Sequence, residues 1–279
     1  MRRQAKGREV RRELLPGESK RLLQELHILT REGNLNADSL RKLKQVNHLA
    51  QLIQPSIEDV LQRFGDPSIV DCGAGKGYLG FVLYELFLAG VDKGRILSIE
   101  SREELVRAAK ERASRLGFGR MDFIHASLDQ AQLPSRLHLV TALHACDTAT
   151  DDALFLAITS NADHVAAVPC CQAEIASQLK EHRALAQPIS SLVAHPIHRR
   201  EFGSHLTNVL RALTLRAHGY KVVVTELTGW EHSLKNELIL AKKVRAFDPS
   251  AQRELDSLLA ATGVQPKLNR RLAALPTAA

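Results

Sequence analysis

The sequence is poor in cysteine and has no long apolar run, and these two absences narrow the class of protein. No stretch of 18 consecutive apolar residues occurs, so we expect no membrane span. The charged N-terminus lacks the apolar core of a signal peptide. A disulfide framework is implausible in a chain of 279 residues. The cysteines form no CxxC pair and lack the spacing of zinc ligands. We therefore predict a cytoplasmic protein with reduced thiols and no bound metal. Its cysteines are Cys72, Cys146, Cys170 and Cys171.

Positive charge outweighs negative charge along the chain, and the excess is uneven. The formal net charge is +7 and the isoelectric point is about 9.4. Residues 1–12, MRRQAKGREVRR, carry six basic side chains and one acid. Such a patch suits polyanions, because neutralising phosphates releases condensed counterions, although a merely solvated terminus has the same composition. With 44% hydrophobic and 25% charged residues, most of the chain should be globular.

The first 65 residues predict a basic helical extension. Leucines recur at helical spacing between residues 11 and 31. Asp38 is placed to cap a second helix. The apolar face of that helix would comprise Leu40, Leu43, Val46, Leu49, Leu52 and Ile53. Pro55 should stop it, and a further short helix is expected over residues 57–64.

Strand and helix patterns alternate through the next part of the chain. Short apolar segments predict strands at residues 68–75, 94–101, 121–128, 137–147 and 163–171. Helical patterns separate most of them, and this alternation predicts a parallel sheet covered on both faces. Two final strands, at residues 220–229 and 236–244, are too close for a crossover helix and should be antiparallel. The predicted α/β domain spans residues 66–245, and residues 246–279 should form a short helix and a flexible tail.

The segment GAGKGYLG, at the end of the first predicted strand, holds four glycines within eight residues. Glycines let the chain turn tightly and let a ligand approach the backbone, while the following helix offers free N–H groups. Gly75, Gly77 and Gly80 satisfy GxGxxG, which favours a nicotinamide dinucleotide. Alternatively, these glycines serve only the packing of the helix against the strand.

Asp71 and the closing antiparallel hairpin, which resembles the end of the class I S-adenosylmethionine (SAM) methyltransferase sheet, favour SAM over a dinucleotide. Asp71 directly precedes the glycines and gives the DxGxGxG form typical of SAM enzymes. Its carboxylate would repel a pyrophosphate but attract the ammonium and sulfonium groups of SAM. Glu100 lies 23 residues after Gly77, at the end of the second predicted strand, where a carboxylate can accept hydrogen bonds from the adenosine ribose of either ligand. We therefore predict SAM as the cofactor.

Three motifs in order resemble a methyltransferase-like family of class I fold: DCGAGKGYLG, LHACDTATDDAL and PCCQAE. The resemblance covers residues 40–244 and includes RKLKQVNHLAQLI and HSLKNELILAKK. The family includes bacterial proteins of unassigned substrate, a eukaryotic group with a glutathione-transferase-like appendage, and eukaryotic enzymes that methylate a ribose hydroxyl in the transfer RNA acceptor stem. The resemblance implies a Rossmann-like α/β fold with a seven-stranded, mostly parallel sheet that ends in an antiparallel hairpin.

The resemblance also implies roles for individual residues. The methionine end of SAM would be shaped by Asp71, Gly73, Gly75 and Gly77. Glu100 would hold the ribose, and Ser127 and Leu128 would flank the adenine, with Asp129 as a hydrogen-bonding partner. His144 lies past the fourth strand, where acceptor and methyl donor meet in this fold, and is also assigned to the cofactor site.

Four residues near the predicted strand ends are candidates for catalysis: His144, Asp147, Cys170 and Cys171. His144 is suited to act as general base on a hydroxyl or amine. Asp147 has the alternative role of helix N-cap, with Thr148 and Thr150 as rivals. Neighbouring strand residues face opposite sides, so one of the two cysteines should line the cleft. It would position substrate or attack a base, with core packing and zinc binding as alternatives.

Three further features are compatible with RNA. One is a lysine–aspartate–lysine–glutamate set like that of ribose 2′-O-methyltransferases, made of Lys44, Asp147, Lys235 and Glu237, although no lysine follows the fifth strand. Another is HPIHRREFGSH, a predicted loop whose Arg199 and Arg200 suit phosphates. The last is Trp230, which is able to stack on a base. Each feature also has a structural alternative. The lysine and glutamate would form a charged hairpin edge, the predicted loop would simply be solvated, and Trp230 would cover the end of the sheet.

Together these patterns predict a SAM-dependent methyltransferase that acts on RNA, with transfer RNA as one candidate. The acceptor would attack the SAM methyl group in line, helped mainly by positioning. A methyltransferase acting on a small molecule or a protein, a SAM- or RNA-binding module without catalysis, and a dehydrogenase are the alternatives.

Overall fold

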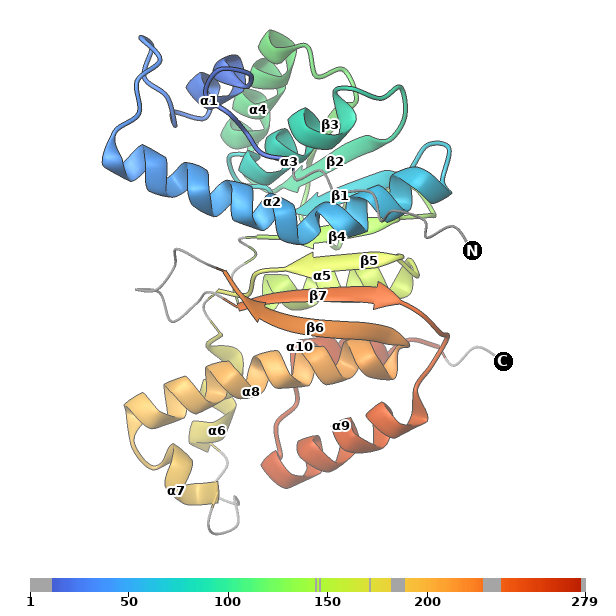
Figure 1. Cartoon of the computed structure of the whole chain (residues 1–279). Coiled ribbons are helices and arrows are strands. Elements are labelled where there is room, and N and C mark those ends of the chain that lie inside the picture. The colour runs from blue at the N-terminus through green and yellow to red at the C-terminus, as the bar shows by residue number, and fades with distance from the viewer. Residues whose placement is uncertain are drawn as a thin grey trace, which may run out of the picture.

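The computed structural model describes residues 12–143, 145, 147–170, 172–181, 189–227 and 237–276 (Figure 1). The strands are β1 (Ser68–Cys72), β2 (Arg95–Glu100), β3 (Met121–His125), β4 (Leu139–Ala142), β5 (His164–Ala167), β6 (Tyr220–Glu226) and β7 (Glu237–Lys243). The helices before β4 are α1 (Lys20–Glu25), α2 (Ala37–Arg63), α3 (Tyr78–Leu83), the π-helix η1 (Tyr84–Leu88) and α4 (Glu103–Leu116). Those after it are α5 (Thr148–Thr159), α6 (Glu174–Glu181), α7 (Ile189–Val193), α8 (Pro196–Ala217), α9 (Pro249–Thr262) and α10 (Lys267–Ala273).

Within the described residues, the strands form a seven-stranded sheet in the order β3-β2-β1-β4-β5-β7-β6. Strands β1 to β5 are mutually parallel, whereas β7 runs antiparallel to both β5 and β6. The strand order reverses between β1 and β4, and ligands of open α/β sheets bind at the carboxyl edge beside such a point. The predicted Rossmann-like sheet with a closing antiparallel hairpin is confirmed.

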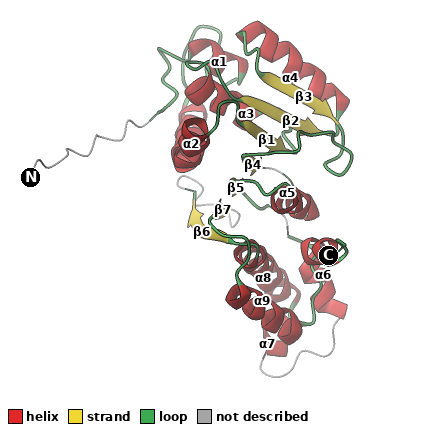
Figure 2. Ribbon diagram, turned by 90° about the vertical axis from the view of Figure 1, so that its right-hand side faces the viewer, coloured by secondary structure: helices red, strands yellow, loops and turns green. Residues whose placement is uncertain are grey.

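Helices cover both faces of the sheet, and each face has its own apolar core. Ile69 of β1 lies in the core that α1–α4 share with one face, and the adjacent Val70 lies in the core shared with α5 and α10. Both side chains are fully buried, as the two-residue period of a strand buried on both faces requires. A third core joins α6 to α9. Figure 2 shows α1–α4 gathered around one end of the sheet and α7–α9 beyond β6 at the other.

The chain before α2 packs into the first core but contains less helix than its leucine spacing predicts. Helix α1 covers only Lys20–Glu25 of the expected residues 11–31. Leu14 is instead held in a non-helical segment by Asn47 of α2, whose side chain accepts the Leu14 N–H at 2.8 Å and donates to its carbonyl at 3.1 Å. His27 then ends α1 with a left-handed backbone, at φ 55°. The leucines that this segment buries are Leu14, Leu22, Leu23, Leu26 and Leu29.

Helix α2 is continuous through Pro55, where the sequence predicts a break. Ile53 and Ile57, on either side of the proline, are both fully buried, and this packing outweighs the loss of one backbone hydrogen bond. The helix is capped by Asn36, whose side chain accepts the Ser39 N–H, and not by Asp38. Neither α2 nor any other described helix is long and apolar enough to cross a membrane.

Two segments predicted to be irregular are helical. Residues 195–205, expected as a loop, form the start of α8, because Pro196 occupies the first turn and the following turns pack on α6. After α9, the expected loose tail contains α10. Lys267 and Arg271 of α10 pair with Asp152 of α5 at 2.7 and 2.5 Å, which anchors the chain there.

Candidate functional site

The turn between β1 and α3 lies at the carboxyl edge of the sheet and has a backbone that requires glycine. Gly73, Gly75 and Gly77 have φ values of 63°, 60° and 75°, in the left-handed region that residues with a Cβ disfavour. A Cβ on Gly77 would also approach the Phe81 ring to 3.0 Å. The backbone of this turn therefore requires glycine, and the approach of a ligand to it stays a prediction.

Asp71 is buried at the end of β1, beneath this turn. Its side chain is 2% exposed, and its Oδ1 accepts a hydrogen bond from Thr141 at 3.1 Å. Its Oδ2 is buried without a hydrogen-bond partner among the described residues. Burial raises the pKa of Asp71 to about 7, against the opposing hydrogen bonds from Thr141 and the Gly80 N–H. A buried oxygen left unpaired is costly, so the site fits a cationic group such as the SAM ammonium.

Glu100 ends β2 and links that strand to the glycine turn. Its Oε2 accepts the Gly75 N–H at 2.8 Å, and its Oε1 accepts the Arg102 N–H at 3.0 Å. The Arg102 guanidinium also donates to both oxygens, at 2.9 and 3.2 Å. Burial raises the pKa of Glu100, but these hydrogen bonds outweigh it and the net pKa lies below the ordinary value. A carboxylate offers about four acceptor sites, and these four hydrogen bonds occupy them. Ribose hydroxyls would therefore bind Glu100 only by displacing the exposed Arg102 guanidinium.

Ser127 and Leu128 lie in the turn that follows β3, next to Glu100 in the sheet. The N–H of Ala126 donates to the Glu100 carbonyl at 3.2 Å, which fixes the start of this turn beside β2. Leu128 packs partly buried against the second core, and Ser127 lowers the pKa of Asp129 through a side-chain hydrogen bond. The positions of Ser127 and Leu128 are compatible with the predicted place of the adenine, and their contact with adenine stays a prediction.

Asp147, in the loop after β4, caps a different helix from the one predicted. It precedes α5 but makes no side-chain cap there. Its Oδ1 instead accepts the N–H groups of Ala173 and Glu174, at 3.0 and 3.3 Å, at the start of α6. Its own N–H donates to the Cys170 carbonyl at 3.2 Å. Asp147 has φ 50° and ψ −118°, a conformation that costs about 1–3 kcal/mol and needs support from its neighbours.

That support includes Arg211 of α8, which the sequence analysis did not identify. Its side chain is 2% exposed and pairs with the equally buried Asp151 at 3.1 and 2.8 Å. The same guanidinium donates to the Asp147 carbonyl at 2.8 Å. The sequence feature that could have identified Arg211 is its position within the apolar stripe of a helix, because a charged side chain is buried there only if it is paired. Arg211 therefore holds Asp147, α5 and α8 together.

The segment after β5 is fixed by a second polar network. Cys170 is half-buried, and Gln172, two residues further on, is buried. Gln172 donates to Asn208 of α8 at 3.2 Å and accepts from Ser204 at 2.9 Å. Asn208 in turn donates to Glu237 of β7. The remaining predicted residues of this region, His144, Cys146 and Cys171, lie outside the described residues.

The lysine–aspartate–lysine–glutamate set is not supported by the positions of its described members. Lys44 is exposed on α2, the Asp147 carboxylate caps α6, and Glu237 accepts from Asn208. Lys235 and Trp230 lie outside the described residues. In α8, Arg199 donates to the Val193 carbonyl at 3.1 Å and Arg200 pairs with Glu201 at 3.1 Å.

A mainly apolar cavity of about 370 Å³ opens beside the glycine turn, and the sequence analysis did not anticipate it. Its sheet side consists of the first residues after three strands, Leu143, Val168 and Leu227. The opposite wall comes from the N-terminal helices and the turn between them, with Leu26, Ile28, Val46 and Leu49. Tyr78 of α3 closes one side, because its hydroxyl donates to the Leu26 carbonyl at 2.9 Å. Lys42 and Lys76 are the lysines among the lining residues.

The sheet order is that of the class I methyltransferase fold that the sequence predicts. The comparison with known families agrees, because residues 41–178 match the family model described as a methyltransferase domain. Residues 41–178 therefore form a methyltransferase domain, and its cofactor is SAM. The site fits SAM on its own chemistry, with an unpaired carboxylate oxygen at Asp71, an open glycine turn and the Glu100 carboxylate.

Curated relatives are longer proteins. A Xenopus laevis protein named glutathione S-transferase C-terminal domain-containing protein is 30% identical over 234 residues, which cover 76% of this chain and 36% of that protein. The Mus musculus protein of the same name is 29% identical over 231 residues, covering 75% of this chain and 34% of that one. This chain thus spans about a third of the length of these relatives. A solved methyltransferase from Podospora anserina with bound SAH has a TM-score of 0.48 at 14% identity, covering 81% of this chain and 88% of that one.

Proposed function

We propose that this methyltransferase transfers the SAM methyl group to RNA and that the target nucleotide enters the cavity beside the glycine turn. The observation that carries the proposal is the composition of that cavity. Its walls are apolar and end at the carboxyl edge of β4, β5 and β6, next to the turn that receives SAM. An unstacked base is a flat ring that gains from apolar walls. Lys76 adds positive charge for the phosphate of the same nucleotide, whereas Lys42, also in the lining, is paired with Asp38 at 2.8 Å.

The charge of the protein agrees with this acceptor. A net charge of +7 attracts a polyanion at long range, whereas a small neutral substrate gains nothing from it. The cavity volume of about 370 Å³ lies within the range of small-ligand pockets and accommodates one nucleotide rather than a folded protein surface. The predicted transfer RNA is one such acceptor.

In this proposal the chain's residues act mainly by positioning. SAM supplies an electrophilic methyl group, and the acceptor heteroatom attacks it in line from the cavity. Asp71 holds the ammonium end and Glu100 the ribose, so that the methyl group faces the loop after β4. Asp147 fixes that loop against α6 and is a positioning residue. His144, three residues before Asp147 in the sequence, is the proposed proton acceptor, and Cys170 and Cys171 are proposed to contact the methyl acceptor.

The direct test uses SAM carrying a tritiated methyl group, the purified protein, and an extract of cells that lack its gene. Products are divided into RNase-sensitive, protease-sensitive and small-molecule fractions. We expect label in the RNase-sensitive fraction, and nucleoside analysis then identifies the methylated atom. Label in either other fraction would contradict RNA as the acceptor. Intact SAM binding without any label would contradict catalysis and favour a binding module.

A matched pair of variants tests the cavity separately. Val46→Trp fills the cavity from the α2 side, because Val46 lines it and is only partly buried. Leu40→Trp makes the same addition on the exposed part of α2, where Leu40 is 43% exposed and lines no part of the cavity. We expect Val46→Trp to abolish methyl transfer while SAM still binds, and Leu40→Trp to keep both. Full transfer by Val46→Trp would contradict the cavity as the acceptor site.

A further inference from the structure

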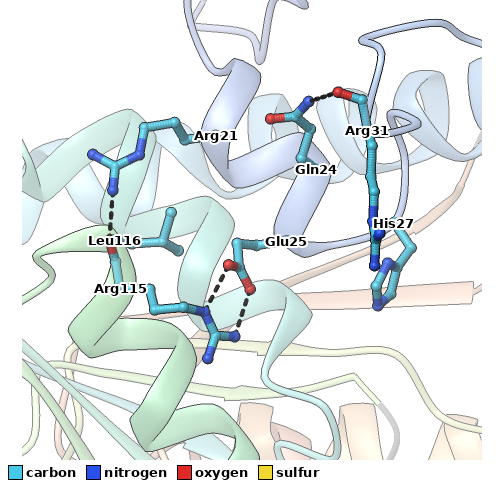
Figure 3. Close-up of a pocket in the computed structure, with 7 residues that line it drawn as sticks. All are labelled: Arg21, Gln24, Glu25, His27, Arg31, Arg115 and Leu116. Carbon is cyan, nitrogen blue, oxygen red and sulfur yellow. Dashed lines mark hydrogen bonds and ion pairs between the residues drawn. The ribbon is translucent and has the colours of Figure 1, made fainter.

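We infer that a second hollow, the α1–α4 cleft, binds the phosphodiester backbone of the RNA whose target nucleotide occupies the cavity. This inference rests on the proposed function. The α1–α4 cleft is about 540 Å³ and lies between α1, the turns that follow it, and the last turn of α4 (Figure 3). Its lining residues are Arg21, Gln24, Glu25, His27, Arg31, Arg115 and Leu116.

Positive charge dominates the α1–α4 cleft. Three arginines and a histidine line it, against the single acid Glu25. Glu25 is already neutralised, because Arg115 forms two hydrogen bonds with it, at 2.8 and 2.7 Å, and Arg112 lies 3.7 Å away. These contacts lower the pKa of Glu25, so it stays ionised and paired. The cleft therefore offers an uncompensated positive field to an anion.

The arginines differ in how free they are to bind. Arg21 donates to the Arg115 carbonyl at 2.7 Å and so completes the end of α4. Arg115 is held by Glu25. Arg31 is exposed, and its side chain makes no hydrogen bond or ion pair to any residue in the described part of the chain. Only its backbone carbonyl is used, as acceptor from Gln24 at 2.8 Å (Figure 3). Arg31 is therefore available as a phosphate ligand.

The position of His27 connects the two hollows. His27 lines the α1–α4 cleft and also lines the cavity proposed for the target nucleotide. Its neighbours Leu26 and Ile28 line the cavity, whereas Glu25 and Arg31 line the cleft. A strand whose base enters the cavity would thus have neighbouring phosphates near the arginines. A phosphodiester chain fits this arrangement because its charges recur along the strand, and guanidinium groups suit phosphate geometry.

The experiment measures binding of fluorescently labelled polyuridylate and bulk transfer RNA by the full chain at several salt concentrations. Arg31→Gln should weaken binding about fivefold at about 0.1 M salt and lower the slope of log affinity against log salt by about 0.7 to 1, the effect of losing one phosphate contact. Arg31→Lys should keep most of the affinity and the slope. The control is Arg253→Gln on the exposed face of α9, which makes the same charge change far along the chain. SAM affinity should be unchanged in all three variants.

The outcomes separate this inference from the proposed function. If RNA is methylated and Arg31→Gln raises KM without changing kcat, both stand. If RNA is methylated and Arg31→Gln binds and reacts like Arg253→Gln, the cleft is refuted and the function stands. If RNA is not methylated but Arg31→Gln still shows the loss of affinity and slope, the function fails and the phosphodiester cleft stands. Binding of an acidic protein, but not of either RNA, through Arg31 would refute the inference.

Discussion

The buried carboxylate of Asp71, whose Oδ2 has no hydrogen-bond partner among the described residues, should make the affinity for SAM depend on pH. Burial raises the pKa of this residue to about 7, so it is largely protonated at about pH 6 in the free protein. Only the ionised form supplies a negative charge to the SAM ammonium. Binding of the cation must then lower the pKa of Asp71 and release a proton. The affinity should rise as pH increases toward the pKa of the free protein.

The size of the effect follows from the fraction ionised. A group with a pKa of about 7 is about one-tenth ionised at pH 6 and about half ionised at pH 7, so SAM should bind about fivefold more tightly at the higher pH. Binding at about pH 6 should release close to one proton. The range stops at about pH 7 because the amino group of SAM itself begins to lose its proton above that value.

The assay is calorimetric titration of SAM in buffers that differ in ionisation enthalpy, which measures affinity and proton release together. Asp71→Asn keeps the shape of the side chain and removes its titration. This variant should bind SAM weakly and with no change between about pH 6 and pH 7. Methylthioadenosine lacks the amino acid part of SAM, so its binding to the unmodified protein should not depend on pH in this range. An equal pH dependence for SAM with Asp71→Asn, or for methylthioadenosine, would refute the assignment of Asp71.

Three other substitutions test the remaining structural claims. Glu100→Gln should weaken SAM binding about 10- to 100-fold in the same titration, because it removes a charged acceptor of the ribose hydroxyls, and unchanged affinity would refute this role. Asp147→Asn should keep kcat within about tenfold in the tritium assay, since the amide oxygen still caps α6, whereas a loss of about a thousandfold would indicate acid–base chemistry. Arg211→Met should lower the free energy of unfolding in urea by about 3–5 kcal/mol because it leaves Asp151 buried and unpaired. The double variant Arg211→Met with Asp151→Leu should recover most of that loss, and no recovery would contradict the pairing.

The cofactor half of the site follows closely from the sequence because its determinants are local. Strand and helix periods differ, so the alternation from β1 to β5 is visible in the order of apolar residues. The left-handed glycines and Asp71 lie within seven consecutive residues, and the contact between Glu100 and Gly75 follows from the pairing of adjacent strands β1 and β2. These features can be predicted without knowing how the helices pack.

The acceptor half depends on contacts between residues far apart in the chain. Asp147 caps α6, and Arg211 reaches the Asp147 carbonyl from α8, 64 residues away. Neither partner can be identified from local propensity, which favours an ordinary N-cap for Asp147. Pro55 remains inside α2 because the buried isoleucines around it outweigh a local rule. The cavity likewise exists only because the N-terminal helices fold back over the ends of β4 to β6.

The central claim, that the turn between β1 and α3 holds SAM, is tested most directly by titrating SAM into the unmodified protein and into Gly75→Arg. Gly75 has φ 60°, and a side chain there would occupy the open turn beside Glu100. We expect one SAM per chain to bind to the unmodified protein, none to bind to a Gly75→Arg variant with an unchanged circular dichroism spectrum, and NADH to bind to neither. Retained SAM affinity in the folded variant, or displacement of SAM by NADH, would contradict the claim.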